Sequence, residues 1–112
     1  MQINTRQVDG MTVIDMSGRL DTSTSGDAYD EMVGIAKSGV TKVVLNLDQV
    51  EYISSAGLRV ILTAAKLLKS SMGEMKICHA NGVVKEVLEI SGFNHLIDIY
   101  DEEKDAIAAL GA

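Results

Sequence analysis

The stretch that decides the fold is Glu51-Tyr-Ile-Ser-Ser-Ala-Gly-Leu-Arg-Val60, in which an extended apolar pattern gives way to a helical one. Before it, Lys42-Val-Val-Leu-Asn-Leu-Asp48 is nearly continuously apolar, as in a strand that is covered on both faces. After it, apolar residues recur every three or four positions and form one face of an amphipathic helix: Leu58, Ile61, Leu62, Ala65 and Leu68. The pattern predicts a strand that ends at Asp48, a turn, and a helix that begins at Ser55.

Two hydroxyl groups, those of Ser54 and Ser55, lie at this turn from strand to helix. A serine hydroxyl there can accept a hydrogen bond from an unpaired helical N–H, and the N-terminus of a helix also favours negative charge. Capping is the ordinary role of such a serine. The small residues Ala56 and Gly57 favour a second interpretation, because they leave the first turn open to an approaching partner. A phosphate on a serine at this position would be compatible with the fold.

These residues resemble the signature of a known family. Tyr52-Ile-Ser-Ser-Ala-Gly-Leu58, preceded by Val43-Val-Leu-Asn-Leu-Asp48, is similar to the signature of STAS domains, in particular the bacterial anti-sigma factor antagonists. Ser17-Gly-Arg-Leu-Asp21 resembles the family's Gly-x-Leu-Asp segment, and the resemblance extends over essentially the whole chain. In the family, the phosphorylated serine follows an Asp and precedes Thr/Ser/Ala-Gly-Leu. The resemblance therefore implies that Ser55 is the acceptor, while Ser54 stands where that Asp often stands.

What the resemblance implies about function is a switch between partners. The unphosphorylated protein would bind an anti-sigma factor that is also a serine kinase of the GHKL ATPase type. Phosphorylation of Ser55 by that kinase would abolish binding, and a PPM-type phosphatase would restore it. The implied partner-binding surface comprises Asp21, Ser54, Ser55, Ala56, Gly57, Leu58 and Arg59. The alternative within the same fold is a STAS domain that regulates a membrane transporter or a lipid-trafficking complex without a phospho-switch.

Composition limits the other possibilities. A chain of 112 residues is long enough for one domain, expected to span residues 1–112, with a core of aliphatic side chains because aromatic residues make up only 4%. The net charge of −6 argues against nucleic acid or anionic membrane as a partner, since both require a basic surface. Cys78 is the only cysteine, and its apolar neighbours predict a buried strand residue. The absence of a signal-peptide pattern and of an apolar run near 20 residues predicts a cytoplasmic protein without direct membrane contact.

The remaining patterns predict an α/β protein with the element order ββαβαβαβα. Residues 3–17 are predicted to form a hairpin around Asp9-Gly10, the dipeptide that a type I′ turn favours. Thr24-x-x-Asp27 is similar to a capping box at the start of a helix. Later strands are predicted at 75–79 and 96–100, with helices after Asn81-Gly82 and from Asp101-Glu-Glu103. A hairpin followed by alternating strands and helices predicts a mixed sheet with about four helices packed against it, as in the STAS fold.

The sequence offers little support for catalysis or metal binding. A serine hydrolase needs a base, for which only His79 and His95 are available, and Ser55 lacks the flanking glycines of a nucleophile elbow. No spacing of Cys, His, Asp or Glu matches a metal motif, and neither glycine-rich phosphate loop occurs. Asp48 could be the acceptor of a receiver domain, but no acidic pair follows the first strands to bind Mg²⁺. We therefore expect a module that is not an enzyme and holds no cofactor or metal.

Overall fold

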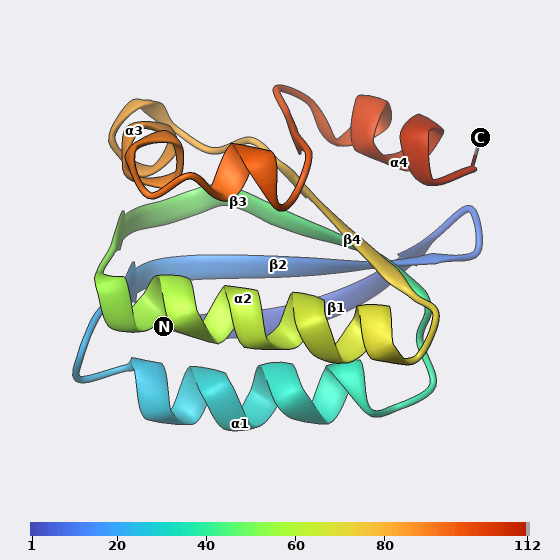
Figure 1. The fold of residues 1–112 in the computed structure, drawn as a ribbon, viewed down its shortest axis with the longest axis horizontal. Coiled ribbons are helices and arrows are strands. Elements are labelled where there is room, and N and C mark those ends of the chain that lie inside the picture. Colours follow the sequence, from blue (N-terminus) through green and yellow to red (C-terminus); the bar gives the residue numbers. More distant parts are fainter. Residues whose placement is uncertain (112) are drawn as a thin grey trace.

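The computed structural model describes residues 1–111, which form a five-stranded sheet flanked by helices (Figure 1). The elements follow in the order β1 (Gln2–Val8), β2 (Met11–Leu20), α1 (Ser25–Ala36), β3 (Lys42–Ile53), α2 (Ser55–Ser70), β4 (Glu74–Cys78), α3 (Gly82–Ile90), the 3-10 helix η1 (Phe93–His95), β5 (Ile99–Tyr100) and α4 (Glu103–Gly111). This is the predicted order ββαβαβαβα, so the predicted fold class is confirmed.

The sheet is mixed, with the strand order β1-β2-β3-β4-β5. β1 and β2 are antiparallel, whereas β2, β3, β4 and β5 run parallel to one another. The first two strands are joined through Asp9 (φ 52°) and Gly10 (φ 80°), whose positive φ angles are those that a type I′ turn requires. The predicted opening hairpin is therefore confirmed, and it leaves β1 and β5 at the two edges of the sheet.

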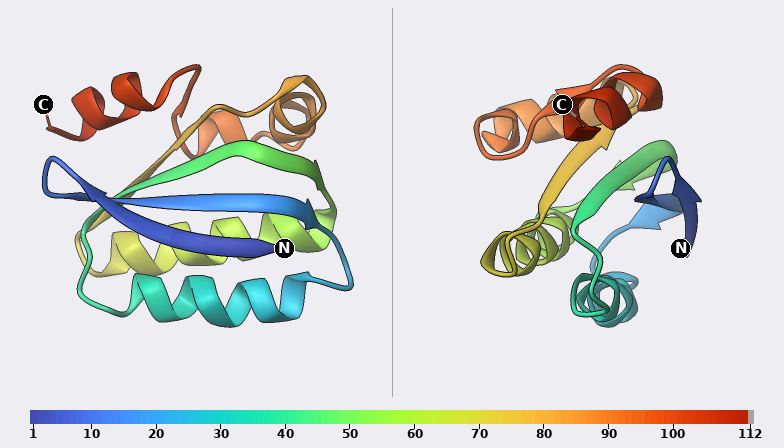
Figure 2. Two further views of the ribbon diagram at one scale, coloured as in Figure 1. Left: turned by 180° about the vertical axis from the view of Figure 1, so that it is seen from behind. Right: turned by 90° about the vertical axis from the view of Figure 1, so that its right-hand side faces the viewer.

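Helices lie on both faces of the sheet (Figure 2). Two apolar clusters join them to it. The larger cluster joins one face of the sheet to α1, α2 and α3, for example through Leu45 of β3, Met32 of α1 and Ile61 of α2. The smaller cluster joins the other face to α4: Met11, Val13, Val44, Cys78, Ala106 and Leu110. Cys78 is fully buried there, as predicted, and burial raises the pKa of its thiol to about 12.

β3 is longer than the sequence predicts. It continues past Asp48 to Ile53 and pairs with β2 as far as the Leu20–Ile53 pair. The apolar pattern ends earlier because Asp48 and Gln49 are exposed although they belong to the strand. Asp48 therefore lies inside a strand and not at its end, which removes the geometric basis for the receiver interpretation.

The start of α1 and the last strand also differ from the predictions. Thr24 precedes α1, but its hydroxyl donates to the carbonyl oxygen of Arg19 (2.8 Å) and accepts from the N–H of Asp21 (2.9 Å). It makes no capping hydrogen bond to the helix, so the predicted capping box is wrong. The last strand covers only Ile99–Tyr100, because η1 and the turn after it occupy the chain up to that point.

Candidate functional site

The ends of β2 and β3 lie side by side and lead into the N-termini of α1 and α2, at the left of Figure 1. Leu20 pairs with Ile53, and the N–H of Ser54 donates to the carbonyl oxygen of Leu20 (2.9 Å). The loop that begins at Asp21 is thereby set next to the turn that contains Ser54 and Ser55. The structure thus brings the two separate segments of the sequence signature to one end of the sheet.

The two neighbouring serines have different environments. Ser54 is the N-cap of α2, with extended backbone (φ −89°, ψ 174°), and its hydroxyl oxygen accepts a hydrogen bond from the N–H of Gly57 (3.1 Å). Ser55 is the first residue of the helix, it is exposed, and its hydroxyl takes no part in this cap. Capping is therefore the role of Ser54, while Ser55 presents an accessible hydroxyl.

Gly57 allows α2 to approach β2 closely. It is buried, and a Cβ at this position would lie 2.7 Å from Cγ of Leu20 and 2.8 Å from its carbonyl oxygen. Both distances are shorter than real Cβ contacts, so only glycine fits without a shift. Ala56 and Leu58 are half-buried and Arg59 is exposed. Of the predicted partner-binding residues on α2, Ser55 and Arg59 are thus the ones that solvent reaches most freely.

Hydrogen bonds to its carboxylate hold Asp21 in the loop after β2. Its Oδ1 accepts from the hydroxyl of Ser23 (2.7 Å), the N–H of Ser23 (3.0 Å) and the N–H of Thr24 (3.2 Å). These bonds, that of the Ser23 hydroxyl foremost, hold the pKa of the Asp21 carboxyl below its ordinary value despite partial desolvation. Asp21 is therefore an ionised, oriented carboxylate in the loop between β2 and α1.

A cation and an aromatic ring that were not among the predicted site residues also lie at this end of the sheet. The guanidinium carbon of Arg19 lies 4.6 Å from the centre of the Tyr52 ring, and its Nε lies 3.6 Å from Oδ2 of Asp21. Arg19 and Tyr52 are partners across β2 and β3. Arg19 and Asp21 are only two residues apart and carry opposite charges, which was a local signal that could have revealed the ion pair.

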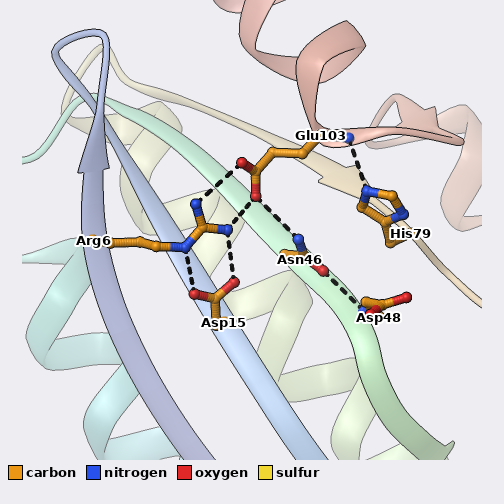
Figure 3. Close-up of polar contacts among 6 residues, drawn as sticks. All are labelled: Arg6, Asp15, Asn46, Asp48, His79 and Glu103. Carbon is orange, nitrogen blue, oxygen red and sulfur yellow. Dashed lines mark hydrogen bonds and ion pairs between the residues drawn. The ribbon is translucent and has the colours of Figure 1, made fainter.

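A second polar cluster fastens α4 to the sheet (Figure 3). Arg6 of β1 donates from Nε to Oδ2 of Asp15 (2.6 Å) and from Nη1 to Oε2 of Glu103 (3.1 Å). Glu103 also accepts from the side-chain amide of Asn46 (3.0 Å), and its backbone N–H donates to Nε2 of His79 (3.1 Å). The hydrogen bonds from Arg6 are the main cause that lowers the pKa of Glu103. His79 is thus a structural residue that accepts a hydrogen bond at the start of α4.

Within residues 1–111, no group of three or more His, Cys, Asp or Glu side chains is arranged to hold a metal ion. That same part of the chain contains no helix with the length and apolar character needed to cross a membrane.

Comparison with known proteins connects this geometry to a family. The family model of the STAS domain matches residues 2–106. The chain belongs to the STAS domain family. The family that the sequence signature suggested is therefore confirmed, and the matched region includes both segments that meet at Ser55.

Two curated relatives of this STAS domain have names that describe regulators of sigma factors. A Bordetella bronchiseptica protein, provisionally named anti-sigma factor antagonist BtrV, is 35% identical over 109 residues, which cover 97% of this chain and 94% of that protein. The anti-sigma F factor antagonist of Paenibacillus polymyxa is 33% identical over 111 residues, which cover 98% of this chain and 95% of that protein.

Solved structures share the fold. An anti-sigma factor antagonist from Mycobacterium paratuberculosis superimposes with a TM-score of 0.90 at 19% identity, covering 99% of this chain and 94% of that one. The anti-sigma factor antagonist SpoIIAA superimposes in its unphosphorylated form with a TM-score of 0.79 (20% identity, 97% and 96% covered). The phosphorylated form of the Bacillus protein SpoIIAA superimposes with a TM-score of 0.73 at 19% identity, covering 97% of this chain and 99% of that one.

Proposed function

We propose that this STAS domain is an anti-sigma factor antagonist that acts by partner switching. Unphosphorylated, it binds an anti-sigma factor that is also a serine kinase of the GHKL type, and the sigma factor is released. Phosphorylation of Ser55 abolishes this binding, and a PPM-type phosphatase reverses it. The names of the two curated relatives support this proposal, as does the existence of SpoIIAA in both phosphorylation states.

The observation that carries the proposal is the difference between the two serines. Ser54 uses its hydroxyl to cap α2, whereas Ser55 exposes its hydroxyl one residue later. A kinase can therefore reach Ser55 without breaking the cap. The helix N-terminus stabilises an added negative charge by about 0.3–1 kcal/mol, so the folded domain tolerates a phosphate at this position.

Electrostatics explains how one phosphate can stop binding. Phosphoserine adds a charge of about −1.5 to −2, and Ser55 lies at the same end of the sheet as the ionised carboxylate of Asp21. A partner that covers this end must desolvate the whole group of charges. A hundredfold loss of affinity corresponds to only about 2.7 kcal/mol, so one unfavourable charged group is sufficient.

The proposed surface divides into residues that touch the partner and residues that support it. Asp21, Ser55 and Arg59 offer polar atoms to solvent at the partner-facing end, with Ala56 and Leu58 half-buried between them. Ser54 and Gly57 support this surface indirectly, because they fix the position of the start of α2. In this proposal the domain is substrate and ligand of other enzymes in the cytoplasm and catalyses no reaction itself. The transporter-associated role remains a prediction from the family resemblance.

The proposal is tested with protein purified from its native cells, before and after treatment with a PPM-type phosphatase. We expect the dephosphorylated protein to capture an anti-sigma factor kinase, the untreated protein to capture much less, and tandem mass spectrometry to place the phosphate on Ser55. Purified protein incubated with ATP alone should stay unlabelled. Phosphate confined to Ser54, or equal capture by both forms, would contradict the proposal.

A further inference from the structure

β1 is a long exposed edge of the sheet. All seven of its residues pair with β2, and no other strand of residues 1–111 lies beside it. In a hairpin closed by a two-residue turn, the residues that flank the turn form a hydrogen-bonded pair, and such pairs recur at every second residue. The flanking residue here is Val8. The backbone N–H and C=O groups of Ile3, Thr5 and Gln7 therefore point away from β2.

β1 lacks the features that usually protect an edge strand from pairing. It contains no proline and no lysine, and its register with β2 is continuous, unlike that between β2 and β3. Its one charged side chain, Arg6, is drawn toward α4 by Asp15 and Glu103. The opposite edge strand, β5, is only two residues long. One edge is thus protected by its shortness, while the other offers a template for a further strand.

A groove runs between this edge and α1, which lie side by side in both views of Figure 2. Its larger part has a volume of about 510 Å³ and is lined on the strand side by Thr5 and Gln7 of β1 and by Thr12 of β2. A smaller part of about 120 Å³ is lined by Ile3, and Glu31 of α1 borders both parts. The groove therefore follows the same three residues whose backbone groups point outward.

The α1 wall of the groove is acidic at one end. It includes Asp27, Glu31, Gly34 and Ile35, whose spacing of i, i+4, i+7 and i+8 is one face of a helix. No Lys or Arg lines either part of the groove. Residues four apart on a helix are separated by about 6 Å along its axis, close to the roughly 6.6–6.8 Å between alternate side chains of a strand. A strand in the groove can thus present two alternate side chains to Asp27 and Glu31.

We propose that this groove binds an extended segment of a partner protein, which pairs with β1 as an additional strand and carries Lys or Arg at two alternate positions facing Asp27 and Glu31. Hydrogen bonds to the outward backbone groups provide affinity, and the two carboxylates select the side chains. A second copy of this chain fits less well. Its own β1 would present Ile3, Thr5 and Gln7 to the acidic wall, because its only cation, Arg6, points to the other face.

Selection of a phage library of random nine-residue peptides on the full chain tests this inference. We expect enriched sequences to alternate β-branched residues with two Lys or Arg residues. A synthetic copy of such a peptide should shift the amide resonances of Ile3, Thr5 and Gln7 and slow their hydrogen exchange. Glu31→Lys should weaken the binding about tenfold or more, because it places like charges opposite one another. Glu86→Lys, the same change of charge on the exposed surface of α3, should leave it unchanged.

A proline on β1 provides a second variant. Thr5→Pro removes an N–H that points away from β2, so we expect the variant to fold and to lose peptide binding. No enriched sequence, equal affinity for the Glu31→Lys variant, or shifts confined to other elements would each overturn the inference. So would a concentration-dependent dimer of the chain alone, seen by analytical ultracentrifugation and abolished by Thr5→Pro, because the edge would then be occupied by a second copy. If Thr5→Pro does not fold, the affinity of the Glu31→Lys variant and the shifts of the β1 amide resonances still test the inference.

Discussion

The backbone N–H of Ser54 donates a hydrogen bond of 2.9 Å to the carbonyl oxygen of Leu20, which joins the start of α2 to the end of β2. The same carbonyl oxygen lies 2.8 Å from the place that a Cβ on Gly57 would occupy. The carbonyl oxygen of Leu20 thus contacts both the N-cap residue of α2 and the glycine at which the helix approaches β2. Ser55 lies between these two contacts in sequence, so the position of the exposed hydroxyl depends on buried neighbours.

Gly57→Ala tests this close approach. We expect its free energy of unfolding to fall by about 1–3 kcal/mol, because the added methyl group has to displace Leu20 or the helix. Urea unfolding provides the measurement. Gly34→Ala is the matched control, since a Cβ there meets no atom within 4 Å. It should stabilise α1 by about 0.5–1 kcal/mol. Equal stability changes in the two variants would show that the contact with Leu20 is unimportant.

The sequence was sufficient for the order of the elements because the signals involved are local. The spacing of apolar residues and the Asp9-Gly10 turn each depend on a few neighbouring positions. It failed where distant segments decide the outcome. β3 extends beyond Asp48 because its exposed residues pair with β2, and Thr24 does not cap α1 because its hydroxyl is bound to the carbonyl of Arg19.

The same distinction applies to the candidate site. The signature placed both serines at the start of a helix, but which one caps it depends on where β3 ends, and Ile53 was outside the predicted strand. The ion pair between Arg6 and Glu103 joins opposite ends of the chain, so no local pattern marks it. Likewise, the burial of Gly57 against Leu20 follows from the way α2 crosses the end of β2.

Ser54→Ala should reveal the division of roles between the two serines. Loss of the hydrogen bond from Gly57 to the Ser54 hydroxyl is expected to lower the free energy of unfolding by about 1 kcal/mol, whereas Ser55→Ala should change it by a few tenths. Thermal and urea unfolding of the two variants measure the difference. A larger loss of stability for Ser55→Ala would mean that Ser55 is the cap. It would contradict the interpretation that the Ser55 hydroxyl is free for a kinase.

Glu103→Gln should change how stability depends on pH. Hydrogen bonds from Arg6 hold the pKa of Glu103 below its ordinary value of 4.5 in the folded protein. The ionised carboxylate therefore stabilises the fold above about pH 4.5, and this contribution disappears as the pH falls through the lowered pKa. We expect the variant to lose about 1–2 kcal/mol of stability at pH 7 and to decline less steeply than the native protein below pH 4.5.

Urea unfolding at pH 7, 4 and 3 measures this dependence. Glu86→Gln, an exposed carboxylate on α3, serves as the control and should follow the native curve. Parallel curves for the native protein and Glu103→Gln would show that the cluster around Arg6 does not hold α4 in solution.

Ser55→Asp separates an effect on binding from an effect on folding. A carboxylate at the first position of α2 lies at a helix N-terminus, so we expect its stability to differ from that of Ser55→Ala by no more than about 1 kcal/mol. Binding to the cognate anti-sigma factor kinase should nevertheless be weaker for Ser55→Asp, because the interface must desolvate the added charge near Asp21. Aspartate carries about half the charge of phosphoserine, so the loss should be partial and should diminish as salt rises. Titration calorimetry at two salt concentrations measures both effects, and equal affinities of the Ala and Asp variants would place Ser55 outside the interface.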